Sequence, residues 1–233
     1  MPIYMFHPAD LLIIPAALFA IWAQLKVKST YQKYASIPTQ RRITGFDIAR
    51  WILQRENINN VDIEVTEGEL TDHYDPISKK VRLSEPVYYG DSIASVGISA
   101  HELGHVIQHA RSYAPMQVRQ LIYPVSSLGS NLAFPLIILG ILLTYFGIHA
   151  QWLINVGIYM FSLAVLFTVV TLPVEFNASK RAIKILSDGR LLTEEELDGV
   201  HAVLSAAALT YVAAAATAIL QLIRLLIIFR GRE

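Results

Sequence analysis

The fold class is decided by two long apolar runs, residues 132–148 (LAFPLIILGILLTYFGI) and residues 152–172 (WLINVGIYMFSLAVLFTVVTL), separated only by His149-Ala150-Gln151. Because a helix needs about 20 predominantly apolar residues to cross a bilayer, each run predicts a membrane span. A link this short predicts that the two spans form a helical hairpin through the bilayer. The alternative, a pair of buried core helices, is weak for runs of this length in so apolar a chain.

The composition agrees with a membrane protein. The 233 residues are 54% hydrophobic and 16% charged, which is too apolar for an ordinary soluble domain. Residues 8–24 predict a retained N-terminal anchor, since no Lys or Arg precedes them and a signal-peptide cleavage pattern is missing. The apolar stretch from Val203 to Phe229 predicts a fourth span, although Arg224 leaves its depth open. The net charge of zero indicates no nucleic-acid partner, and no pattern indicates an oligomeric state.

The basic residues predict the orientation of the chain. Of the 19 Lys and Arg, twelve lie between the first and second spans and four lie between the third and fourth. These two segments lie on the same side in any four-span threading, and the positive-inside rule makes that side cytoplasmic. The three C-terminal arginines do not fit this scheme and leave open a last helix that lies in the interface or re-enters the membrane.

A polar region follows the first span. Apolar residues at helical spacing predict a surface helix that begins after Thr44-Gly45 and ends near Asn57. Between residues 61 and 84 the period changes to alternation, which predicts a small two- or three-stranded sheet. An exposed edge strand of this sheet could pair with an extended peptide. A plain structural hairpin is an equally good interpretation.

The stretch Ser99-Ala100-His101-Glu102-Leu103-Gly104-His105-Val106-Ile107-Gln108 carries the chemistry. His101 and His105 are four apart, so a helix places them on one face, where two imidazoles can hold a zinc ion. Glu102 beside them can accept a proton from the attacking water. Asp91-Ser92 can cap this helix, whose polar residues exclude lipid exposure and place the site at a membrane surface or inside the protein.

A catalytic zinc site needs a third protein ligand, and the absence of Cys restricts it to His or a carboxylate. Glu175 follows the third span directly, and the hairpin returns the chain to the membrane side of His101 and His105. Pro173 is suited to the first position of a new helix. In that helix, Glu175 could instead be a carboxylate that the helix dipole stabilises near the N-terminus. His73, His109 and His201 are competing ligands.

HELGHVIQ, followed after two spans by LPVEFNASKRA, resembles membrane zinc peptidases of the bacterial YugP type, and the resemblance covers nearly the whole chain. It is more distantly similar to the HtpX/Ste24 metallopeptidases. The resemblance implies one Zn²⁺ per chain, held by His101, His105 and Glu175, with Glu102 as general base. The distant relatives carry Asp four residues after the ligand Glu, where this chain has Ser179.

Further residues are candidates for supporting roles. Asn177 or Ser179 could orient a zinc ligand. A donor must also stabilise the oxyanion that forms during peptide hydrolysis. The candidates for that role are His73, Tyr74, Arg181 and Tyr211.

The sequence thus predicts a mainly α, multi-pass membrane protein with about four transmembrane helices and a membrane-surface α+β zincin-like catalytic domain. The predicted segments are an N-terminal anchor (1–25), a catalytic region (26–120), a transmembrane hairpin (121–172), a third-ligand helix (173–200) and a C-terminal transmembrane helix (201–233). The expected function is zinc-dependent cleavage of peptides or membrane proteins at the cytoplasmic face of a bacterial cytoplasmic membrane.

Two other functions are open to test. An intramembrane protease would carry H-E-x-x-H inside a long apolar run, which residues 85–115 are not. A non-enzymatic membrane scaffold or transporter could hold a structural zinc ion, but such sites are closed by four ligands and usually include Cys.

Overall fold

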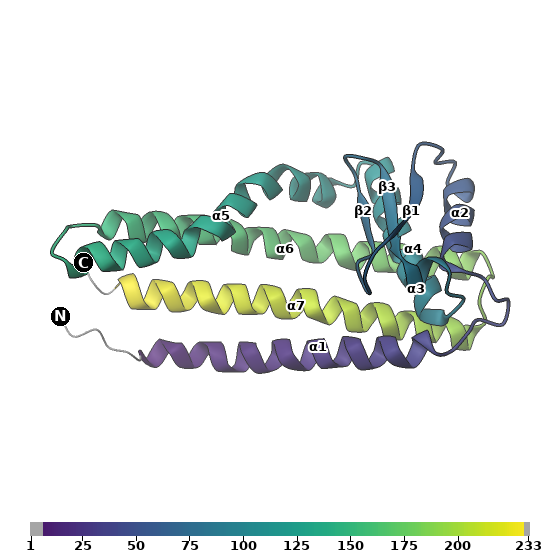
Figure 1. Cartoon of the computed structure of the whole chain (residues 1–233), viewed down its shortest axis with the longest axis horizontal. Coiled ribbons are helices and arrows are strands. Elements are labelled where there is room, and N and C mark those ends of the chain that lie inside the picture. The colour runs from purple at the N-terminus through teal and green to yellow at the C-terminus, as the bar shows by residue number, and fades with distance from the viewer. Residues whose placement is uncertain (1–6, 231–233) are drawn as a thin grey trace. The chain divides into compact units, whose positions relative to one another are not determined.

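The computed structural model describes residues 7–230, which form long helices and one small sheet (Figure 1). The elements in chain order are η1 (Pro8–Leu12), α1 (Ile13–Ala35), α2 (Gly45–Arg55), β1 (Asp62–Thr66), β2 (His73–Asp75), β3 (Lys80–Ser84), α3 (Glu85–Tyr88), α4 (Ile93–Ala110), α5 (Ala114–Tyr145), α6 (Gln151–Asp188) and α7 (Glu194–Arg230). The predicted fold class, mainly α with a small sheet, is confirmed.

Four helical segments of the described chain are long and apolar enough to cross a membrane. Their bounds are Pro8–Ala35, Ala114–Tyr145, Gln151–Asp188 and Glu194–Phe229. They expose large apolar side chains, including Leu18 (63%), Leu121 (78%) and Tyr159 (74%), as lipid-facing helices do. The prediction of about four spans is confirmed.

The chain divides into two compact units. The helical unit takes residues up to 22, 118–172 and residues from 211, and the mixed unit takes residues 23–117 and 173–210. In the helical unit, α5, α6 and α7 share a cluster that includes Ile137, Ile154 and Leu225. A methyl group at Gly157 of α6 would lie 2.7 Å from the carbonyl oxygen of Ala133 in α5. A residue without a side chain therefore lets these two helices approach closely.

Arg224, which left the depth of the last helix open, has a partner in the helical unit. Its guanidinium forms an ion pair with Asp10 of η1. The other carboxylate oxygen of Asp10 accepts a hydrogen bond from the backbone N–H of His7 at 2.7 Å. A paired charge is tolerated in an apolar helix far better than a lone one, so Arg224 is compatible with a helix that crosses the membrane.

The prediction that Pro173 begins a new helix is wrong, because α6 runs through it from Gln151 to Asp188. Proline cannot donate to the carbonyl one turn earlier, which costs the helix one hydrogen bond. Long apolar helices tolerate this loss when neighbouring turns and helices hold them in place. The helix ends at Asp188, and α7 begins with a capping box in which Glu196 Oε2 accepts from Thr193 N at 2.8 Å.

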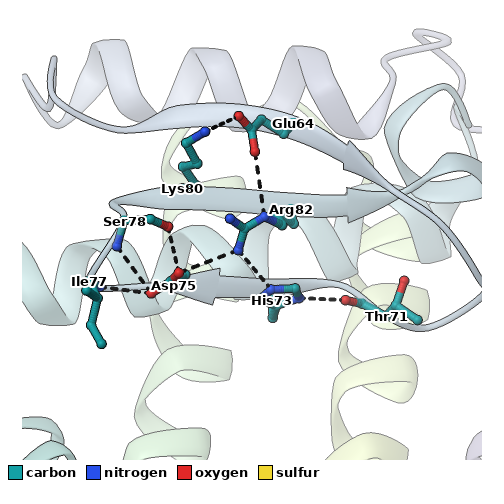
Figure 2. A network of polar contacts seen from close by, with 8 residues as sticks. All are labelled: Glu64, Thr71, His73, Asp75, Ile77, Ser78, Lys80 and Arg82. Carbon is teal, nitrogen blue, oxygen red and sulfur yellow. Dashed lines mark hydrogen bonds and ion pairs between the residues drawn. The ribbon is translucent and has the colours of Figure 1, made fainter.

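The sheet of the mixed unit has the order β1-β3-β2. β1 runs parallel to β3 and pairs Ile63 with Val81, whereas β2 is antiparallel to β3. The predicted small sheet is confirmed, with β1 and β2 as its two edges. Polar side chains link the three strands on one face (Figure 2): Arg82 of β3 lies 3.6 Å from Glu64 of β1 and 3.5 Å from Asp75 of β2.

The opposite face of the sheet is apolar and joins the core of the mixed unit. Val81 and Leu83 of β3 are fully buried in a cluster with residues of α2 and α4. The apolar face of α2 packs against α4, and β2 and β3 also contact α4. Ser92 caps α4 as predicted, with its Oγ accepting from Ser95 N at 3.1 Å. The helix that carries H-E-x-x-H is thus held by packing on several sides.

Candidate metal centre

His101 and His105 lie one turn apart on α4, as their spacing predicts. Their ring centroids are 4.8 Å apart and their planes are nearly perpendicular, at 86°. His105 is buried and His101 is partly exposed, with 13% of its side chain accessible. The Nε2 atoms of both rings point to the same place, since each lies near one carboxylate oxygen of α6.

That carboxylate belongs to Glu175. Its Oε2 lies 3.3 Å from His101 Nε2 and 3.4 Å from His105 Nε2, and its side chain is 4% exposed. The ligand atoms of the three residues all lie within 4.8 Å of one another. Two imidazole nitrogens and one carboxylate oxygen are the donor set of a catalytic zinc site, which leaves a fourth position open. The chemistry of these side chains fits a zinc ion.

Small residues allow α4 and α6 to come close enough for this arrangement. A methyl group at Gly104 would lie 2.6 Å from the carbonyl oxygen of Ala178 in α6. At Gly97 it would lie 3.2 Å from the Val200 side chain of α7. The structure shows close approach, most tightly at Gly104.

Glu102 lies beside the two histidines and is almost fully buried, with 8% of its surface exposed. Burial raises the pKa of its carboxyl to about 7, while His101 opposes this rise and Glu175 adds to it. A carboxyl group that ionises near neutral pH can both accept and return a proton under ordinary conditions. Its position and its pKa suit a general base.

A polar network lies behind the cluster, and it includes a residue that the sequence analysis missed. Gln108 Oε1 lies 3.0 Å from His105 Nδ1, and Gln108 Nε2 donates to Val174 O at 2.7 Å and to Asn177 Oδ1 at 3.1 Å. Asn177 Oδ1 also accepts from Arg181 Nε at 2.7 Å. The sequence did hold a sign of this role, because Gln108 is a polar residue three positions after His105 and therefore lies on the same face of the helix.

The residues predicted to support the site differ in how closely they approach the cluster of His101, His105 and Glu175. Ser179 Oγ lies 3.1 Å from His101 Nδ1, so this serine contacts a member of the cluster directly. Asn177 reaches the cluster only through Gln108. The guanidinium of Arg181 lies 5.8 Å from the centre of the Tyr113 ring. Tyr211 belongs to the helical unit and is 36% exposed.

The competing histidines have other partners. His73 lies on β2, where its Nδ1 is 2.8 Å from Thr71 O and its Nε2 is 3.4 Å from Arg82 (Figure 2). His109 Nδ1 is 2.7 Å from the hydroxyl of Tyr74, another oxyanion candidate. His201 Nδ1 lies 3.3 Å from Ser205 Oγ. Among the described residues, the one cluster of three or more potential metal ligands is His101, His105 and Glu175.

A cavity of about 480 Å³ lies along the C-terminal part of α4. Val106 and His109 of α4, Tyr74 of β2 and residues 57–61 line it, together with Lys79 and Ala110. None of the three clustered residues is among its lining residues, so this cavity adjoins the helix of the site without being the metal centre.

Comparison with known proteins places the chain in a family. Residues 9–230 match the model of a family described as "Putative neutral zinc metallopeptidase". The chain is 46% identical over 223 residues to "Putative membrane protease YugP" of Bacillus subtilis (strain 168), covering 95% of this chain and 97% of that relative. No solved structure matches. With 222 consecutive residues matched by the family model and so extensive an identity to a membrane protease, the chain belongs to this family of neutral zinc metallopeptidases.

Proposed function

We propose that this protein is a membrane-embedded zinc-dependent endopeptidase in which His101, His105 and Glu175 hold one Zn²⁺ and Glu102 is the general base. The observation that carries the proposal is the convergence of His101 Nε2, His105 Nε2 and Glu175 Oε2, which come from two helices far apart in sequence. The gluzincin-like order, H-E-x-x-H followed by Glu, supports peptide hydrolysis over other zinc chemistry.

The chain's own residues have defined tasks in this reaction. A bound zinc ion would polarise the scissile carbonyl and lower the pKa of the attacking water. Glu102 accepts the proton of that water and passes it to the leaving amine. The buried setting of Glu102 and Glu175 limits competition from bulk water, which strengthens the electrostatic interactions at the reacting atoms.

We propose that the site faces the cytoplasm from a bacterial cytoplasmic membrane. The two segments that supply the site, residues 26–120 and 173–200, hold sixteen of the 19 Lys and Arg. The substrates would be peptides or proteins, as the name of the relative indicates for that protein.

Zinc content and casein cleavage by the purified full-length protein in detergent test the catalytic proposal. Glu102→Gln should keep about one zinc per chain and lose cleavage, because the amide cannot accept the proton. Glu175→Gln should lose zinc, and Glu194→Gln, on the exposed first turn of α7, is the matched control. Cleavage by Glu102→Gln, or a wild type that binds zinc without cleaving, would contradict the proposal and favour a structural site.

The chain contains no cysteine, so single cysteines can report its orientation. Ile77→Cys lies in the β2–β3 turn, where Ile77 is 94% exposed, and His149→Cys lies in the exposed link between α5 and α6. A membrane-impermeant maleimide added to intact cells should label His149→Cys and spare Ile77→Cys until the cells are permeabilised. The reverse pattern would overturn the proposed orientation.

A further inference from the structure

The side chain of Gln108 is fully buried between α4 and α6, and each end of its amide meets different partners. One end faces the ring of His105, and the other faces the backbone of Val174 and the side chain of Asn177. Val174 immediately precedes Glu175 in α6. A single amide therefore connects one candidate ligand to the segment that carries another.

The orientation of this amide is fixed by its partners. The carbonyl oxygen of Val174 can only accept a hydrogen bond, so the NH₂ group of Gln108 must be the end that lies 2.7 Å from it. Asn177 Oδ1 must also act as an acceptor there, because Arg181 Nε, which is only a donor, lies 2.7 Å from it. Turning the Gln108 amide over would place its oxygen against two other oxygens.

The orientation of the amide in turn fixes the tautomer of His105. Gln108 Oε1 offers only lone pairs, so the hydrogen bond of 3.0 Å requires a proton on His105 Nδ1. A neutral imidazole with its proton on Nδ1 carries its lone pair on Nε2. Glu175 Oε2, which also accepts hydrogen bonds, lies farther away, at 3.4 Å from His105 Nε2, and it is shared with His101 Nε2 at 3.3 Å. The shorter contact with Gln108 therefore directs the proton of a neutral His105 to Nδ1 and leaves Nε2 open to a metal.

His101 provides an internal contrast. Its Nδ1 lies 3.1 Å from the hydroxyl of Ser179, and a hydroxyl can donate or accept. Ser179 therefore accommodates either tautomer of His101, whereas Gln108 accepts only one tautomer of His105. Gln108 thus restricts the tautomer of its histidine, and Ser179 does not.

We propose that Gln108 is a positioning residue that holds His105 in the Nδ1–H tautomer before any metal arrives, so that Nε2 is ready to bind it. The usefulness of this tautomer rests on the proposed function, because it matters only if the site binds zinc. The tautomer itself is a property of the metal-free protein. A neutral amide achieves this without adding a third negative charge next to Glu102 and Glu175, both of which are buried.

The direct test is ¹⁵N NMR of histidine-labelled, metal-free full-length protein in nanodiscs at pH 8.5, where an ordinary imidazole is neutral. The shifts of the two ring nitrogens report which one carries the proton, and a spectrum of His105→Ala assigns the signals. The wild type should show His105 protonated at Nδ1. A wild-type His105 protonated at Nε2 would overturn the inference, and this measurement needs no Gln108 variant to fold.

Two variants test the consequence for the metal. Gln108→Met keeps the size but removes the acceptor, so His105 should shift toward the Nε2–H tautomer and the zinc Kd should rise about 10–100-fold. Gln108→Glu keeps the acceptor and should retain the Nδ1–H tautomer. Ser179→Ala is the control and should leave the tautomer of His105 unchanged. The Kd is measured by chelator competition, with circular dichroism to verify the fold.

The possible failures are distinguishable. If the wild type showed the Nδ1–H tautomer but bound no zinc, the proposed function would fail while the orientation of His105 by Gln108 stood. If Gln108→Met folded and kept both the wild-type tautomer and the wild-type zinc Kd, the positioning role would be wrong while the proposed function stood.

Discussion

Gly104 of α4 and Ala178 of α6 meet backbone to backbone, such that a methyl group at position 104 would lie 2.6 Å from the carbonyl oxygen of Ala178 and 3.0 Å from its carbonyl carbon. Gly104 directly precedes His105, and Ala178 follows Glu175 by three residues. The third candidate ligand reaches the two histidines because the glycine of H-E-L-G-H leaves room for the neighbouring backbone.

Gly104→Ala should therefore disrupt the metal site strongly, although it adds only one methyl group. The added methyl meets backbone, which cannot rotate away, so α4 and α6 must separate, at a cost of about 1–3 kcal/mol in the free energy of unfolding. Glu175 would then move away from His101 and His105, and bound zinc should fall well below one per chain. Metal analysis and thermal unfolding of the detergent-purified variant measure the two effects.

Gly97→Ala is the matched control for this variant, because it lies on the same helix and the new methyl would meet the side chain of Val200 at 3.2 Å. A side chain can shift by a few tenths of an ångström, so zinc content should stay near the wild-type value. Equal zinc loss in both variants would mean that the alanines act through the stability of α4 and not through its approach to α6.

Asp75 should make the stability of the sheet depend on acidity. Hydrogen bonds from the Ser78 hydroxyl and from the backbone N–H of Ile77 lower the pKa of its carboxyl to about 2, with Arg82 contributing (Figure 2). Because the folded pKa lies below the unfolded value of about 3.9, the stabilisation is complete above that value and is lost as the pH falls toward 2.

The measurement is the thermal midpoint of the wild type and of Asp75→Asn between pH 6 and pH 2. The difference between the two proteins should be constant down to about pH 4.5 and then shrink as the wild-type carboxylate is protonated. Other acid-sensitive groups affect both proteins alike and cancel in the difference. A difference that stays constant down to pH 2 would contradict the role assigned to Asp75.

Asp10 and Arg224 should depend on one another for stability. Removing Asp10 leaves the Arg224 guanidinium without its carboxylate in an apolar helix, where an unpaired charge is costly. Asp10→Leu should therefore lower the thermal midpoint in nanodiscs strongly. The double variant with Arg224→Leu should recover much of the loss.

A double-mutant cycle separates the ion pair from the other role of Asp10, which accepts a hydrogen bond from His7 N at 2.7 Å. The loss of that bond occurs in both Asp10 variants and cancels in the cycle. Strictly additive effects of the two substitutions would show that the ion pair contributes nothing to the membrane-spanning form of α7.

Local patterns in the sequence were enough to predict the spans, the small sheet and the helix of H-E-x-x-H. Apolar runs of span length, the alternation between residues 61 and 84, and the cap at Ser92 each depend on residues within a few positions of one another. Their physical causes, helix hydrogen bonding, side-chain period and capping, act over the same short range. Pro173 was misread because the local penalty of a proline is outweighed by the packing of the long helix around it.

Only the tertiary structure shows which residues of different helices and strands contact one another. The parallel pairing of β1 with β3, the ion pair between Asp10 and Arg224, and the amide of Gln108 between His105 and Val174 all join residues that no local pattern relates. The sequence by itself determined that two histidines and a glutamate share one turn of a helix that is too polar to face lipid. That Glu175 completes the cluster depends on the contact of Gly104 with Ala178, because a site built from two helices exists only where their backbones meet.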